Sequence, residues 1–426
     1  MKNEKNVFIL GALAVGLAFS SCDSDTPENG TFTKEQEKKI IEEINAEDII
    51  EYNEQNQKAW GNYMAVVGKL LVDDANALYD DWTKSYNGGK PYAEIFKEHK
   101  SEALKLNSAY DCLALLVTYM DHIADEVGSE KIGSPYRKYT EKWPNKANMK
   151  AGLYAVESWY SWHSRLDYMN NILSIRNGYY GVYDKSFSKL SKAHANSLYA
   201  YVEKNDPALN KKVAQAIEKA IKAIENIPQP FRNHINSSET KTAADAAAEL
   251  NEVLAKDMQS FLDKHKNDHK GLDPIVSHVV DEVIVPTYSD LKKYNKELYQ
   301  KILAFQAKPS NEGFEACCEA WIKARQPWES SEAYLFGPVA DKGLDPNMDT
   351  WPLDIDGIEN ILKSEDWNKL NWSGDFVEDE EGDNGSSQLS PEEKKKAEAI
   401  SSAQSLRGYH TIEFLIFKNG KPRKIK

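Results

Sequence analysis

Apolar side chains recur at three- and four-residue steps along most of the chain after Lys34. This step is the period of one buried helix face. Sustained alternation of apolar and polar positions, which would indicate a large sheet, is hardly found. We therefore expect an all-α fold. The clearest predicted helices are Lys34–Glu51, Asn56–Trp82, Tyr92–Asp125, Met149–Asn177, Leu190–Val202, Ala208–Ile227, Thr240–His265, Val285–Ala307, Asn311–Ala324 and Pro391–Phe417.

Short stretches that favour turns separate these helices, at 87–91, 228–236, 267–274 and 343–347. Helices of this length joined by short turns favour packed antiparallel bundles. The chain has 426 residues, more than one hydrophobic core usually serves. We therefore expect two helical bundles, a first unit at residues 35–275 and a second at 276–426.

The N-terminus has the features of a signal peptide. Two lysines precede an apolar run from Val7 to Phe19, which is too short to cross a bilayer comfortably. The small residues that lead into Cys22 resemble a bacterial lipoprotein signal, which implies cleavage after residue 21 and a lipid on Cys22. We expect residues 23–34 to be a tether and the protein to be an exported lipoprotein of the outer membrane, on its periplasmic or cell-surface face.

Charge and cysteine content limit the partners. The net charge of −14 argues against nucleic acid as a partner and is compatible with cationic ligands. We expect contact with the membrane only through the N-terminal lipid. Besides Cys22 the chain has only Cys112, Cys317 and Cys318, too few for a disulfide framework, and we interpret them as core side chains.

The first candidate for chemistry lies near the C-terminus, in the predicted helix that ends at Phe417. His410 and Glu413 are one turn apart in an apolar row of this helix. A carboxylate there has to be paired or hydrogen-bonded. Gly408 removes a side chain, so that another helix or a ligand can approach. The pair is either part of a functional site or a satisfied hydrogen bond in the core.

In a second stretch, charged residues lie within an apolar helix face. Trp321, Arg325, Trp328 and Glu332 recur at helical spacing, and Pro327 should kink the helix between them. Arg325 and Glu332 either form an ion pair that stabilises the kink or belong to a ligand site. Shortly afterwards, Asp354 is either a helix cap or a ligand group.

A third stretch is the predicted helix Met149–Asn177. Glu157, Ser161 and Asp167 lie along one polar face of it. Such a row is either the solvated side of the helix or the lining of a cavity between domains. The chain has no H-E-x-x-H helix, no G-x-S-x-G elbow, no phosphate-binding glycine loop and no C-x-x-C pair, so standard hydrolase chemistry has no recognisable site.

These three stretches together resemble the imelysin-like proteins. "GYHTIE" at 408–413 matches the family's G-x-H-x-x-E signature, "AWIKARQPWESSEAYLFGPV" and "WPLD" resemble a second block, and "ESWYS" with "DYMNNILSIRNGYYG" a third. The family is all-helical, periplasmic or lipid-anchored, associated with bacterial iron uptake and classified as metallopeptidases.

The resemblance implies a site shared between two bundles. It implies metal ligands, for iron first and zinc or copper otherwise, at His410, Glu413, Glu332 and Asp354. It implies ligand-binding roles for Arg325, Trp328, Gly408, Glu157, Ser161 and Asp167. We expect a binding protein that acts with iron-uptake components. The alternatives are a metallopeptidase using the same site, or a protein that binds a peptide or small ligand without metal.

The blocks do not follow the family's order, in which the "ESWYS" block comes last. The simplest explanation is a circular permutation with the original ends joined around residues 265–285. Permutation is tolerated where the original termini lie close together on the surface. It predicts that the helix Asn56–Trp82 packs with the second unit, against helices between Val283 and Phe417.

Overall fold

The computed structural model describes residues 32–46, 50–140, 146–190, 192–371 and 391–425. The signal segment with Cys22 and the tether up to residue 31 lie outside them. Nearly all secondary structure in the described residues is helical, which confirms the all-α prediction. The exceptions are an isolated bridge between Ser101 and Leu106 and a short antiparallel hairpin of β1 (Phe417–Lys418) and β2 (Lys421–Pro422).

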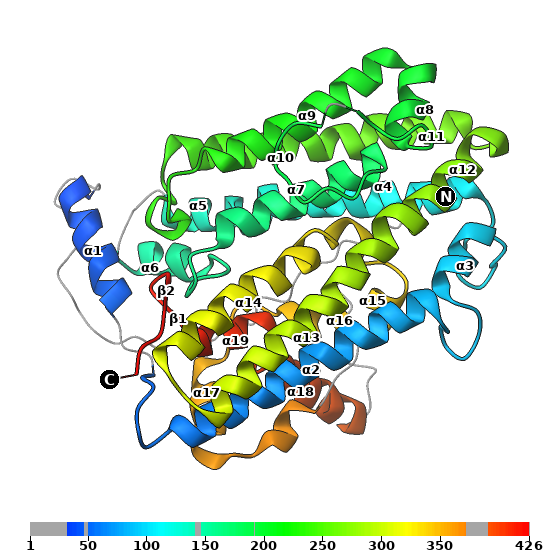
Figure 1. Ribbon diagram of the computed structural model, residues 1–426. Helices are drawn as coiled ribbons and strands as arrows, with labels where there is room; N and C mark the ends of the chain where they lie inside the picture. Colours follow the sequence, from blue (N-terminus) through cyan, green and yellow to red (C-terminus); the bar gives the residue numbers. More distant parts are fainter. Residues whose placement is uncertain (1–31, 47–49, 141–145, 191, 372–390, 426) are drawn as a thin grey trace.

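The helices pack in two layers (Figure 1). The upper layer in this view consists of α4 (Ala109–Asp125), α5 (Gly133–Tyr139), α7 (Ser164–Tyr180), α8 (Leu198–Asn205), α9 (Pro207–Glu225), α10 (Ser238–Glu252) and α11 (Gln259–His265). The lower layer consists of α2 (Gln57–Thr83), α13 (Val285–Ala307), α14 (Asn311–Glu329), α16 (Leu344–Asp349), α17 (Ile355–Ser364), α18 (Pro391–Gln404) and α19 (Gly408–Ile416).

Shorter elements connect and flank these layers. The helices are α1 (Lys34–Ala46), α3 (Tyr92–Glu98), α6 (Lys146–Tyr154), α12 (His269–Val279) and α15 (Pro338–Asp341). The π-helical turns are η1 (Glu126–Lys131), η3 (Val253–Met258) and η4 (Val280–Ile284), and the 3-10 turns are η2 (Phe231–Asn233), η5 (Glu332–Tyr334) and η6 (Trp367–Leu370). The two layers meet where α7 lies against α14, and where α4 and α7 lie against η5.

The predicted packing of α2 with the second unit is confirmed. The helix packs most extensively against α13, and Gly68 allows close approach because a Cβ there would lie 2.9 Å from Ile302 Cδ1. The Trp60 indole donates to the carbonyl of Leu415 at 2.9 Å, and the Tyr63 hydroxyl donates to that of Leu406 at 2.7 Å. A circular permutation relative to the family stays a prediction.

Three long predicted helices are broken in the structure. The segment 92–125 divides into α3 and α4, because Ser108 caps a new helix by accepting from Asp111 N–H. The segment 149–177 divides into α6 and α7 around an irregular loop at 155–163, in which Ser158 and Trp162 have positive φ. The third break separates α18 from α19 just before Gly408, whose φ of 88° lies outside the helical region.

The remaining differences concern helix bounds. The stretch 267–274 is not a full break, because α12 starts at His269 and Pro274 lies inside it. The helix α8 starts only at Leu198, and α14 runs past the predicted end at Ala324 and through Pro327 to Glu329. Among the described residues, no helix combines the length and apolar character needed to cross a bilayer.

Candidate functional site

The site begins with α19, where His410 and Glu413 remain one turn apart although the helix is shorter than expected. His410 Nδ1 lies 2.8 Å from Glu413 Oε2, and both side chains are fully buried. The apolar row that we predicted on the helix Pro391–Phe417 is interrupted, because α19 begins at Gly408. The pairing of His410 with Glu413 does not depend on that longer helix.

The other oxygen of Glu413 reaches the upper layer. Its Oε1 accepts the backbone N–H of Tyr160 at 2.9 Å, the N–H of Ser161 at 2.7 Å and the Ser161 hydroxyl at 2.8 Å. All three donors lie in the loop 155–163, which replaces the middle of the predicted helix. Ser161 therefore contacts Glu413 only because the helix is broken there, and the Glu413 carboxylate joins the two layers.

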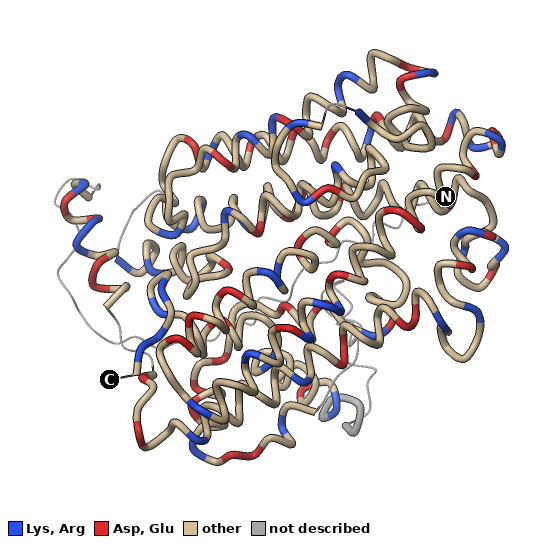
Figure 2. Tube along the Cα trace, viewed as in Figure 1, with Lys and Arg blue, Asp and Glu red and all other residues tan. Residues whose placement is uncertain are grey.

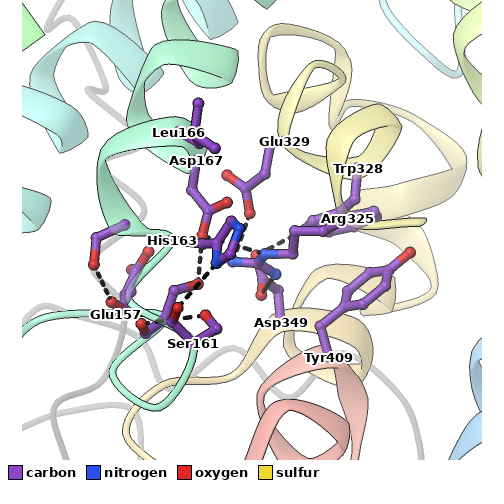
Figure 3. A network of polar contacts seen from close by, with 12 residues as sticks. Glu157, Ser161, His163, Leu166, Asp167, Arg325, Trp328, Glu329, Asp349 and Tyr409 are labelled. Carbon is purple, nitrogen blue, oxygen red and sulfur yellow. Dashed lines mark hydrogen bonds and ion pairs between the residues drawn. The ribbon is translucent and has the colours of Figure 1, made fainter. Parts of the chain in front are cut away.

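Arg325 on α14 is the centre of a second group of contacts (Figure 3). Its guanidinium pairs with Asp349, with Glu329 Oε1 at 2.5 Å and with Asp167 Oδ2 at 3.5 Å. The side chain is 2% exposed, so these carboxylates balance a cation that is removed from water. The predicted pair of Arg325 with Glu332 is wrong, because α14 ends at Glu329 and Glu332 lies in the following 3-10 turn.

Further donors hold these carboxylates. Asp349 Oδ2 accepts from the Trp328 indole at 2.8 Å, and Glu329 Oε2 accepts from Asn171 Nδ2 at 2.6 Å. Asp167 on α7 accepts from the Ser158 hydroxyl. The predicted residues Arg325, Trp328 and Asp167 therefore meet at one place, from both layers.

His410 links the two groups. Its Nε2 lies 3.2 Å from Asp349 Oδ1, so each ring nitrogen faces a carboxylate. Burial and Arg325 disfavour the charged ring, but the hydrogen bonds to Asp349 and Glu413 raise the pKa of His410 to about 9. Arg325 Nη2 also lies 3.4 Å from Nε2, but two donors cannot bond, and we assign the Nε2–H to Asp349. The ring is an imidazolium in this arrangement and has no lone pair for a metal.

A set of oxygen ligands lies next to this network. Carboxylate oxygens of Glu329, Glu332 and Asp349 lie within 4.8 Å of one another. Glu332 is 7% exposed, and within the described residues it has no hydrogen bond or ion pair. Burial raises the pKa of Glu329 and of Glu332 well above the ordinary value, whereas Arg325 and His410 overcome burial and hold the pKa of Asp349 well below it. These oxygens could hold a cation.

Further carboxylates lie around Lys131, next to this set of oxygen ligands. Its Nζ lies 3.0 Å from Glu157 Oε2 and 3.3 Å from Glu126 Oε1, and its side chain is 5% exposed. Glu157 is one of the predicted residues, and it lies in the loop 155–163. The structure adds Asp345 on α16, whose pKa burial and the neighbouring Asp349 and Glu126 raise to about 7.

Asp354 has the capping role that the sequence left open. Its Oδ1 accepts the backbone N–H of Gly357 at 2.9 Å, at the start of α17. None of its hydrogen bonds reaches the carboxylates around Arg325. Gly408 allows close packing, since a Cβ there would lie 2.5 Å from the carbonyl oxygen of Met348 on α16. The element that approaches Gly408 is therefore the helix that carries Asp345 and Asp349.

Sequence reasoning missed Glu329, Asp349, Lys131, Asp345 and Glu126. The four-residue spacing of Arg325 and Glu329 on one helix was a usable signal. Glu126 and Lys131 lie in the π-helical turn η1, a feature that is frequent at functional sites but has no clear sequence pattern. Asp349 and Asp345 are brought to the site only by tertiary packing.

Comparisons with known proteins support one family. The family model described as imelysin matches residues 37–256 and 284–425. A solved imelysin peptidase from Bacteroides ovatus is 46% identical, with 88% of this chain and 99% of that chain covered and a TM-score of 0.78. Iron-regulated protein A of Synechococcus elongatus is 39% identical over 80 residues, which are 19% of this chain and only 22% of that relative.

Proposed function

This chain belongs to the imelysin family, and on that premise we propose that it is an exported protein that binds an iron ion between its two helical layers. The proposed ligands are the carboxylates of Glu329, Glu332 and Asp349. The name of the cyanobacterial relative, an iron-regulated protein, is consistent with this role. The signal-like N-terminus supports export, with Cys22 as the residue that would carry a lipid.

The observation that carries the proposal is the unpaired Glu332. A buried carboxylate without a partner is costly, and a bound cation would remove that cost. Carboxyl groups also outnumber cations around it. Three cations, Arg325, Lys131 and His410, face eight carboxyl groups, which are Glu126, Glu157, Asp167, Glu329, Glu332, Asp345, Asp349 and Glu413.

Three carboxylate ligands favour a hard cation, and ferric iron is the hardest of the iron, zinc and copper ions considered. Carboxylate oxygens suit hard cations, while imidazole and thiolate suit the softer ones. His410 keeps both nitrogens for Asp349 and Glu413, so it supports the ligand Asp349 without binding the ion. Hydrogen bonds of this kind to a metal ligand typically change metal affinity 10- to 100-fold when they are removed.

Metal binding to purified protein is the direct test. Calorimetry with ferrous ion under nitrogen, ferric citrate, zinc and copper should show saturable binding that is tightest for iron. Glu332→Gln should weaken it by ~10-fold or more. The matched control is Glu359→Gln, a substitution of an exposed glutamate on α17 that pairs with Lys363. Absence of binding to the unaltered protein, or equal affinities in both variants, would contradict the proposal.

A metallopeptidase is the second candidate, because the solved relative is named an imelysin peptidase. A bound metal would act there as a Lewis acid on water. Glu413 is a poor general base since both of its oxygens already accept hydrogen bonds, so Glu332 is the better candidate. A peptide library incubated with the protein should then be cleaved, and cleavage should be lost with chelator and in Glu332→Gln. A protein that binds iron and cleaves no peptide supports the binding role alone.

A further inference from the structure

Arg232 connects the helix α1 to the loop that holds Glu413. It lies in the 3-10 turn η2 and is 1% exposed. Its Nη1 donates to the carbonyl of Trp159 at 2.7 Å, and its Nη2 donates to Asn45 Oδ1 on α1. The guanidinium also lies over the Trp159 ring, 3.3 Å from the ring centroid. Within the described residues it has no carboxylate partner, so these contacts balance the burial of its charge.

The turn of the β1–β2 hairpin makes a second connection. Asn419 Nδ2 donates to the carbonyl of Asn45 at 2.9 Å, and the backbone N–H of Gly420 donates to the carbonyl of Tyr160 at 2.9 Å. Glycine is required there, because a Cβ at Gly420 would lie 2.5 Å from Trp162 Cε3. The end of α1 is thus joined to the loop 155–163 at two neighbouring carbonyls.

The N–H groups of the same loop reach the proposed site. Those of Tyr160 and Ser161 donate to Glu413, whose other oxygen is held by His410. His410 in turn lies 3.2 Å from the proposed ligand Asp349. Every step from α1 to Asp349 is therefore a direct contact or a segment of the same short loop.

The helix α1 has few buried side chains. It has 13 residues, of which only Ile40 and Ile44 are buried, and Figure 1 shows it at the edge of the molecule. Isolated helices shorter than ~12–15 residues are marginal in water, so α1 depends on docking for its structure. Elements with few buried apolar contacts open at a low cost in free energy.

We infer that α1 is a strap whose docking is coupled, through Arg232 and the hairpin turn, to metal binding in the interlayer site. This inference rests on the proposed function. Docked α1 holds the loop 155–163 on Glu413, and undocking releases it. Arg232 is a positioning residue, since it touches none of the proposed ligands. Coupling between two sites is reciprocal, so iron should in turn slow the opening of α1.

Asn45→Ala tests the coupling without iron. It removes the acceptor that α1 offers to Arg232 and leaves every residue of the proposed site in place. Hydrogen exchange followed by mass spectrometry should show ~10-fold faster exchange in the loop 155–163 than in the unaltered protein. Asn45→Asp keeps an acceptor for Arg232 and should keep the loop protected. The control Lys38→Ala, on a side of α1 where Lys38 is 76% exposed, should leave the exchange unchanged.

The second measurement uses ferric citrate. Calorimetry should show that Asn45→Ala weakens iron binding ~5-fold or more, while Asn45→Asp and Lys38→Ala bind like the unaltered protein. Iron should also slow hydrogen exchange along α1 in the unaltered protein. A structural role of Asn45 confined to α1 would change neither the iron affinity nor the exchange of the loop 155–163.

The outcomes separate this inference from the function beneath it. Equal exchange of the loop 155–163 in Asn45→Ala and the unaltered protein overturns the inference. Equal iron affinities of these two proteins overturn it as well and leave the proposed function standing. Absence of iron binding to the unaltered protein overturns the proposed function and, with it, the coupling to metal.

Discussion

Ser161 gives both its backbone N–H and its hydroxyl to one oxygen of Glu413, across the boundary between the two helical layers. The other oxygen of Glu413 is held by His410. The signature histidine and glutamate therefore connect α19 to the loop 155–163. Their hydrogen bonds are complete without any ligand.

This relationship predicts an asymmetric effect of two substitutions. Glu413→Gln places an amide N–H against the protonated Nδ1 of His410, and we expect a loss of ~2–3 kcal/mol in the free energy of unfolding. Ser161→Ala removes one of three donors and should cost ~1 kcal/mol. Urea unfolding of both variants measures the difference. Equal losses would mean that the layers are not joined through Glu413.

Substitution of Glu332 should increase the stability of the metal-free protein and weaken iron binding. Because its carboxylate is buried without a partner, Glu332→Gln should raise the free energy of unfolding of the metal-free protein at pH 8 by ~1 kcal/mol or more. The same variant should bind iron weakly. Thermal unfolding with and without iron separates the two effects. A variant that is less stable than the parent in the absence of metal would show that Glu332 has a partner.

His410 predicts a dependence of stability on pH. Its pKa is raised from an ordinary value of 6.5 to about 9, so its contribution is complete below pH 6.5 and is lost as the pH rises through 9. At ~1.4 kcal/mol per unit of pKa, the contribution is on the order of 3 kcal/mol. The difference in unfolding free energy between the parent and His410→Gln should shrink over this range. A difference that stays constant from pH 6 to 9.5 would show a neutral histidine.

Proton release predicts how binding varies with pH. Burial raises the pKa of the proposed ligands Glu329 and Glu332, so these two groups hold protons that a cation must displace, and it raises the pKa of the neighbouring Asp345 to about 7. Iron affinity should therefore increase between pH 5.5 and 8, and calorimetry in buffers of different ionisation enthalpy should register released protons. The metal-free protein should lose stability over the same interval. A carboxyl group with a raised pKa keeps its proton in the native state and loses it in the unfolded state, so a rising pH favours unfolding.

Gly88 provides a matched control for a substitution at Gly408. Gly408→Ala combines backbone strain at φ 88° with a clash against the Met348 carbonyl, and should cost more than ~2 kcal/mol and displace α16 with the proposed ligand Asp349. Gly88 also has positive φ, but its Cβ would meet nothing within 4 Å. Gly88→Ala should therefore show the strain alone, ~1 kcal/mol, with iron affinity unchanged. Circular dichroism melts and calorimetry compare the two.

The helical class could be predicted from the sequence because the apolar period is strong and local. The helix breaks could not, since the segment 149–177 keeps a helical pattern through a loop that Glu413 and Arg232 hold. Arg232 donates to the carbonyl of Trp159 at 2.7 Å, from a turn far along the chain. Such long-range contacts override local propensity.

The candidate site could be predicted only in part, because long-range contacts bring some of its residues together. His410, Glu413, Arg325 and Trp328 lie in short motifs with visible spacing. Asp349 lacks such a pattern, and its role depends on how Gly408 lets α16 approach α19. Asp354 was the aspartate that the sequence suggested as a ligand, but its carboxylate caps the start of α17.

The helices α12, η4 and α13 follow one another without a break from His269 to Ala307, and Figure 1 shows this single rod passing from the upper layer into the lower one. At ~1.5 Å per residue the rod is roughly 60 Å long. Two layers that share such a rod cannot slide past each other. The π-helical turn η4 lies between the α12 and α13 parts of the rod. The relative position of the two layers therefore depends on one continuous backbone as well as on the side chains of Glu413 and Arg325.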